Sequence, residues 1–153
     1  MMEGLLGTAA PLEADVVLLL EIAMGVGLLV GGWLARAGRF RLHAWCQSVI
    51  VLVNFIVIVL VMSPSFRMQV LPRIPEKLGK SYVALAAAHA TLGGITELAA
   101  LYILLAAGTR LLPEKLRITR YKGWMQGVLA LWWITLLLGV TTYIRWYVPH
   151  LFR

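Results

Sequence analysis

Long apolar stretches, separated by short polar or basic stretches, run through the whole sequence. A helix that crosses a membrane needs about 20 mostly apolar residues, and four stretches reach that length. The stretches do not alternate between apolar and polar positions, and backbone polar groups in lipid must be satisfied within each segment, so we expect helices. The predicted spans are residues 16–35, 44–62, 82–107 and 124–148.

The three connections between these spans are short, at residues 36–43, 63–81 and 108–123. Short connections make consecutive helices antiparallel neighbours. The sequence therefore predicts an all-α integral membrane protein, an up-and-down four-helix transmembrane bundle that forms a single membrane domain over residues 1–153.

Prolines in the second connection are expected to break any helix there, because proline lacks the backbone N–H that a helix interior needs. The Ser-Pro-Ser stretch at residues 63–65 reads as the exit from the second span. The prolines concerned are Pro64, Pro72 and Pro75.

Composition strengthens the membrane interpretation, since 61% of the 153 residues are hydrophobic and only 14% are charged. Soluble domains are about half apolar and a quarter charged, so a soluble monomeric domain is excluded. The one cysteine, Cys46, excludes an intramolecular disulfide and every cysteine-rich zinc or iron–sulfur motif. Nucleophilic triads, phosphate-binding loops and dinucleotide fingerprints are also absent from the sequence, so we expect a protein that is not an enzyme.

The net charge of +7 comes from basic residues just outside the apolar stretches, where they meet anionic lipid headgroups, so nucleic acid is not expected as a partner. The first and third connections hold eight Lys and Arg residues, and the opposite side holds six. The positive-inside rule then places both termini outside the cytoplasm. Residues 1–15 contain no Lys or Arg, so we interpret the first apolar stretch as a retained span and not as a secretory signal.

Small residues recur every four positions in the first and third spans and predict close helix packing. A contact within the chain is favoured over a homodimer face. The stripes are Ala23, Gly27 and Gly31, and Ala86, Ala90 and Gly94.

Ionisable residues inside a span are costly, by about 2.5 kcal/mol or more, and therefore mark candidate sites. Glu21 and His89 lie at similar depths, roughly 9 and 12 Å from the outer face, so they could meet in one layer. Two interpretations stay open for this pair: a proton-handling or ligand-binding site, or a polar contact that fixes helix register.

A second polar layer is predicted near the middle of the membrane, where Glu97 lies at nearly the depth of Asn54, with Thr135 as a third member. Hydrogen bonding between helices is the favoured interpretation of this layer.

Haem b has to be considered, because four-helix membrane bundles often hold it between two histidines. Ligation by two histidines needs imidazoles at matching depth, and His43 and His89 are separated by roughly 15 Å of depth. His150 would need the tail to fold back beneath Pro149. A haem held by His89 alone stays open, although no cofactor is expected.

Three sequence features resemble a small family of four-span bacterial membrane proteins, domain of unknown function 420, which includes the CtaM-like proteins needed for active haem-copper terminal oxidase. The first is a histidine after basic residues in Arg39-Phe40-Arg41-Leu42-His43. The second is a histidine among alanines in Ala86-Ala87-Ala88-His89-Ala90. The third is Trp132, Thr135, Gly139 and Tyr143 in the fourth span, after a basic connection.

The chain departs from the family at Thr119-Arg120-Tyr121-Lys122-Gly123, where the family carries a further histidine. This departure favours an accessory or structural role over cofactor binding. The resemblance implies a non-enzymatic accessory or assembly factor of a haem-copper oxidase in the bacterial cytoplasmic membrane.

Two alternatives stay open. One is a small transmembrane subunit of a larger respiratory or photosynthetic complex. The other is a haem- or quinone-binding redox protein that uses His89 with Glu21 or Glu97. In each case the expected partners are membrane lipids and, for an accessory protein or subunit, other transmembrane chains.

Overall fold

A computed structural model describes residues 4–109, 111–117 and 119–148. The described residues contain no strand, and four of their helices are long and apolar enough to cross a membrane. These are α1 (Leu12–Arg36), the continuous helical stretch that starts with α2 (Phe40–Val57), α5 (Ser81–Gly108) and α6 (Tyr121–Tyr147). The predicted spans are therefore confirmed as helices, to within a few residues at most ends.

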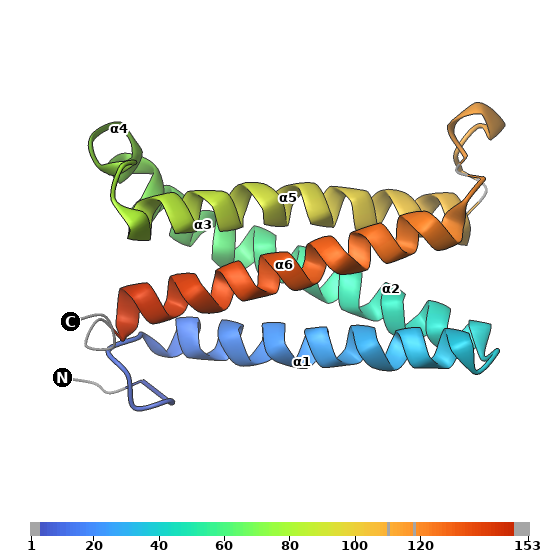
Figure 1. Cartoon of the computed structure of the whole chain (residues 1–153), viewed down its shortest axis with the longest axis horizontal. Helices are drawn as coiled ribbons and strands as arrows, with labels where there is room; N and C mark the ends of the chain where they lie inside the picture. The colour runs from blue at the N-terminus through green and yellow to red at the C-terminus, as the bar shows by residue number, and fades with distance from the viewer. Residues whose placement is uncertain (1–3, 110, 118, 149–153) are drawn as a thin grey trace.

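Consecutive long helices run in opposite directions along one bundle (Figure 1). The start of α1, the end of α6 and the short helices after α2 lie at one end, which we call the terminal end. The α1–α2 and α5–α6 connections lie at the opposite end, which we call the loop end. The up-and-down arrangement follows from the short connections, as expected.

The turn between α1 and α2 depends on Gly38, whose φ of +73° is a left-handed conformation that favours glycine. The Gly38 N–H donates to the Ala35 carbonyl at 3.1 Å, and the Arg39 N–H donates to the Leu34 carbonyl at 2.9 Å. This pair of bonds is the Schellman motif, which closes the end of α1 and reverses the chain within three residues.

The second helix does not end at Ser63-Pro64-Ser65, so the expected break of the helix at these prolines is wrong. Helical structure continues from Phe40 to Lys77 through two π-helical turns, η1 (Ile58–Met62) and η2 (Phe66–Val70). Between and after these turns lie α3 (Ser63–Ser65), η3 (Leu71–Arg73) and α4 (Ile74–Lys77).

The physical reason lies in the turns next to Pro64, which has no N–H to donate and stands in a short segment between the two π-helical turns. The wider π-helical turns on both sides of Pro64 accommodate the missing bond, and such turns are frequent at functional sites. As a result, the stretch around residues 63–69, expected to be a connection, forms part of the bundle wall.

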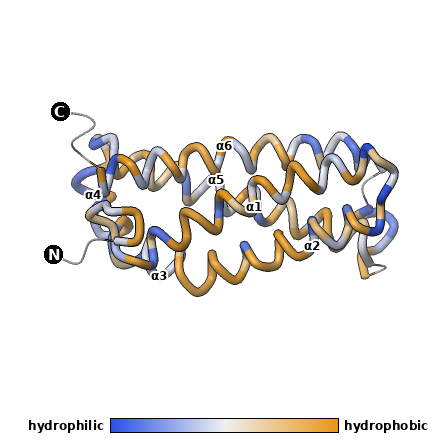
Figure 2. The backbone as a smooth tube through the Cα atoms, turned by 90° about the horizontal axis from the view of Figure 1, so that it is seen from below, coloured by the Kyte–Doolittle hydropathy of each residue, from blue (hydrophilic) through white to orange (hydrophobic). Residues whose placement is uncertain are grey.

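Inside the bundle, α5 packs extensively on α6 and α1 packs extensively on α2. Large apolar side chains nevertheless cover the outside, and Figure 2 shows hydrophobic residues along the length of the bundle with hydrophilic ones gathered toward its two ends. Leu60 and Leu98, for example, are each 69% exposed. Such a surface suits a lipid environment and does not suit water.

Two apolar clusters form the interior. One lies between α1, α2, α5 and α6, and the other lies where α5 and α6 meet η2 near the terminal end. The buried members of the first are Met24, Leu28, Ile50, Val51, Ala100 and Trp132, and those of the second are Val70, Val83 and Ala86.

The small-residue stripe of α1 packs within the chain, as expected. A Cβ atom added at Gly27 would lie 2.8 Å from Ile50 Cδ1, so this glycine lets α2 approach closely. The stripe of α5 behaves differently, because a Cβ atom added at Gly94 would meet nothing within 4 Å. Ala90 and Gly94 instead line the cavity described next.

Candidate functional site

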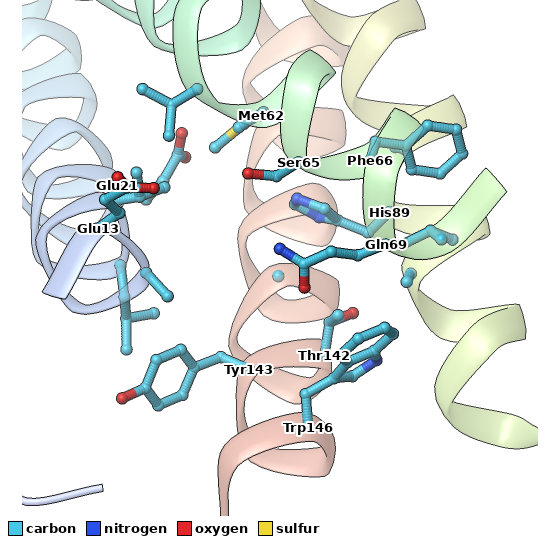
Figure 3. Close-up of a pocket in the computed structure, with 18 of the residues that line it drawn as sticks. Glu13, Glu21, Met62, Ser65, Phe66, Gln69, His89, Thr142, Tyr143 and Trp146 are labelled. Carbon is cyan, nitrogen blue, oxygen red and sulfur yellow. The ribbon is translucent and has the colours of Figure 1, made fainter. Parts of the chain in front are cut away.

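A cavity lies between α1, the continuation of α2, α5 and α6, in the half of the bundle nearer the terminal end (Figure 3). It consists of two adjoining compartments with volumes of about 240 and 340 Å³. The residues shared by both compartments are Glu21, Met62, Phe66, His89 and Ala90. The wall of the first compartment is mostly apolar, which is the usual character of a small-molecule site with a few converging polar groups.

His89 is fixed against α6 by a hydrogen bond of 3.0 Å between its Nδ1 atom and the backbone carbonyl of Thr135. A carbonyl oxygen can only accept, so Nδ1 carries the proton and donates. In the neutral imidazole this leaves Nε2 as an acceptor. Nε2 has no partner among the described residues, and Figure 3 shows the ring pointing into the cavity from α5.

The absence of a side chain at Gly139 leaves the space that the imidazole of His89 occupies. A Cβ atom at residue 139 would lie 2.8 Å from Cε1 and 3.3 Å from Nδ1 of His89. Because real Cβ atoms essentially never come closer than 3 Å to another heavy atom, the ring fits only against a glycine. Three residues of the family-like pattern, Thr135, Gly139 and His89, thus form one structural unit.

Glu21 reaches the same cavity from α1, on the side opposite His89 (Figure 3). Its Oε1 atom is buried and has no hydrogen-bond partner among the described residues. The predicted layer of Glu21 and His89 is present in the sense that both line the same two compartments. The two side chains make no hydrogen bond to each other, so they do not simply satisfy one another across the helices.

Asn54 and Glu97 form the predicted contact near the middle of the bundle, where Asn54 Nδ2 donates to Glu97 Oε2 at 2.9 Å. Both are buried, with exposed fractions of 7% and 4%. The remaining oxygens, Asn54 Oδ1 and Glu97 Oε1, have no partner among the described residues. Thr135 does not join this pair, since its hydroxyl lies 3.3 Å from the Thr96 hydroxyl.

His43 takes part in a different contact, at the loop end. Its Nδ1 atom donates to the Gly31 carbonyl at 2.8 Å, and Cys46 and Gln47 on the same helix donate to the carbonyls of Gly27 and Leu28. Glycines on α1 leave these carbonyls accessible, so polar side chains of α2 bond directly to the backbone of α1. His43 is therefore a contact between two helices.

In the described part of the chain, the cavity is lined by one imidazole only, that of His89. The described residues also hold no group of three or more His, Cys, Asp or Glu side chains that could bind a metal ion. His150, the other histidine considered at the sequence level, lies outside the described residues.

Trp132 and Tyr143, the two aromatic residues of the family-like pattern, have separate surroundings. Trp132 is 4% exposed, belongs to the first apolar cluster and lines the larger compartment. Tyr143 lines the smaller compartment and donates its hydroxyl proton to Asp15 Oδ1.

Asp15 was not recognised as a site residue, because the sequence places it in an acidic tail before the first apolar stretch. It is fully buried in the structure, accepts the Leu6 N–H at 2.9 Å and binds the Tyr143 hydroxyl. The Thr8 hydroxyl lies 2.7 Å from the same phenolic oxygen. The available signal was a single carboxyl group next to an apolar stretch, and its partner lies 128 residues away.

Ser65 and Gln69 were missed for another reason, namely that their stretch was expected to be a connection. Both line the smaller compartment because the helix continues past Pro64.

Comparisons with protein-family models, with curated proteins and with solved structures give no significant match. The function is therefore inferred from the residues of the cavity.

Proposed function

We propose that this chain is a non-enzymatic accessory protein of a respiratory membrane complex, and that it holds a small lipid-soluble molecule in the cavity between its helices. The observation that carries the proposal is a pair of polar atoms without partners, the acceptor His89 Nε2 and Glu21 Oε1, in one mostly apolar cavity. A buried acceptor without a donor costs about 1–3 kcal/mol, so a bound donor would stabilise the site.

The partner complex comes from the resemblance described above, which implies a haem-copper terminal oxidase. Large apolar side chains on the outside of all four long helices would support docking to other transmembrane chains as well as contact with lipid. The excess of basic residues at the loop end supports a cytoplasmic position for that end, with both termini outside the bacterial cytoplasmic membrane.

A haem b on His89 is the second candidate. Proteins that ligate a metal through one imidazole nitrogen commonly anchor the other nitrogen to a carbonyl, as Nδ1 of His89 is anchored to Thr135. The cavity offers no second imidazole in the described residues, so such a haem would need Glu21 or a non-protein group on its other face.

Gentle purification of the full chain from its native membrane tests the proposal. We expect oxidase subunits among the co-purifying chains, a colourless preparation, and an organic molecule that is enriched over bulk lipid and lost in His89→Ala. A Soret band that disappears in His89→Ala would favour the haem candidate. A protein that purifies alone, with no enriched molecule, would contradict the proposal.

A further inference from the structure

Glu21 Oε1 and the acceptor His89 Nε2, both without partners, lie on opposite walls of one cavity. Glu21 enters from α1, whereas His89 enters from α5 and is held against α6 (Figure 3). Because they are not bonded to each other and have no other partner in the described residues, a ligand that satisfies both must carry polar groups at two separated points, with a hydrogen-bond donor at His89 Nε2.

The walls between these points favour a flat, uncharged body. Tyr143 and Trp146 contribute aromatic rings on the side toward the end of α6, and small residues leave room beside them. Trp146 is held in place, since its Nε1 donates to the Tyr82 carbonyl at 3.0 Å and the Arg73 guanidinium lies 5.0 Å from its ring centroid. Rigid aromatic walls of this kind suit a ring that stacks against them.

The phosphate of a phospholipid does not fit the first compartment. It brings only acceptor oxygens, which cannot donate to His89 Nε2. No Lys or Arg lines that compartment in the described residues. An oxidised quinone is mismatched at His89, because its two carbonyl oxygens can only accept.

We propose that the cavity binds the headgroup of a lipid-soluble hydroquinone, with one ring hydroxyl donating to His89 Nε2 and the opposite hydroxyl donating to Glu21. This inference rests on the proposed function and names the class of molecule held there. The apolar tail extends along the side of the cavity formed by α1 and the continuation of α2. Val17 and Leu18 of α1 and Val61 of η1 supply apolar contacts on that side.

The probes are a decyl-substituted hydroquinone, its dimethyl ether and the corresponding oxidised quinone, titrated anaerobically into the full chain in phosphatidylcholine nanodiscs. Calorimetry measures binding, and protein-free nanodiscs correct for partition into lipid. The dimethyl ether keeps the ring and the tail but has no donor. We expect the hydroquinone to bind at least about tenfold more tightly than either of the other two, which corresponds to about 1.4 kcal/mol.

Glu21→Leu removes one acceptor while placing a membrane-compatible side chain in α1, so folding is not endangered. We expect this variant to lose about threefold in hydroquinone affinity and to keep a reduced preference for the hydroquinone over the ether, because His89 Nε2 still accepts one hydroxyl. His89→Phe keeps a ring of similar shape and is expected to have the same effect. Glu76→Leu is the matched control, because Glu76 is exposed on α4 and does not line the cavity.

Equal affinities for the hydroquinone and its dimethyl ether in the unaltered protein would overturn the inference, as would a preference of unchanged size in both Glu21→Leu and His89→Phe. If another organic molecule is enriched in protein from native membranes and is lost in His89→Phe, the proposed function stands and the hydroquinone assignment fails. If nothing is enriched and nothing binds on titration, both fail.

Discussion

The imidazole of His89 lies directly against the backbone of Gly139, so that a methyl group at residue 139 would approach its Cε1 to 2.8 Å. Gly139→Ala therefore has to push the ring away from α6 and weaken the bond to the Thr135 carbonyl. We expect about tenfold weaker ligand binding, together with a loss of about 1 kcal/mol in stability. Thermal unfolding and ligand titration of the purified variant measure the two effects.

Gly127→Ala is the matched control on the same helix, because a Cβ atom there would meet nothing within 4 Å. Alanine favours a helix over glycine by up to about 1 kcal/mol, so this variant should bind ligand normally and unfold at the same or a higher temperature. Equal loss of binding in both variants would show that the packing of His89 on Gly139 has no special role.

Because Asn54 and Glu97 share a hydrogen bond, we expect substitutions of these two residues to have non-additive effects on the free energy of unfolding. Asn54→Leu leaves a buried Glu97 oxygen without its donor, and we expect a loss of about 1–3 kcal/mol in the free energy of unfolding. The double variant Asn54→Leu, Glu97→Leu removes both polar groups and should recover most of that loss. A double-mutant cycle in one detergent measures the coupling, and additive losses would contradict it.

Substitution of His43 is expected to lower stability and leave ligand affinity unchanged, whereas substitution of His89 is expected to lower ligand affinity. His43→Ala removes the donor to the Gly31 carbonyl and should lower stability by about 1 kcal/mol, while ligand affinity stays unchanged because the residue does not line the cavity. Parallel unfolding and titration of the two histidine variants separate the roles. A large loss of ligand affinity in His43→Ala would contradict the separation.

The proposed orientation is open to a labelling test, since Cys46 is the only cysteine. In a Cys46→Ala background, Gly79→Cys lies near the terminal end and Glu114→Cys lies in the connection at the loop end. A maleimide that cannot cross membranes should label Gly79→Cys in intact cells, and Glu114→Cys only after lysis. The reverse labelling pattern would contradict the proposed orientation and place both termini in the cytoplasm.

Sequence reasoning identified the four helices because an apolar stretch of spanning length has few other stable structures in lipid. It also predicted the contact between Asn54 and Glu97, since depth in a straight helix follows from the rise per residue. The same counting brought Glu21 and His89 to one cavity. It could not show that they stand apart across an open space, because depth does not fix which way a side chain points.

The errors have physical causes as well. Pro64 signals a missing N–H in the sequence, but not the π-helical turns that let the helix continue past it. Asp15 could not be assigned, because its partners come from the N-terminal segment and from the last helix. Gly94 looked like a packing position, and its open surroundings become visible only once the path of α2 is known.

Asp15 lies near the start of the first long helix, and the phenol that binds it belongs to the last. During synthesis, α1 is therefore made with a carboxyl group whose phenolic partner is still unmade until nearly the whole chain has been translated. The bond that joins the first and last long helices can form only once α6 is in place, so a product lacking α6 leaves Asp15 with the Leu6 N–H alone.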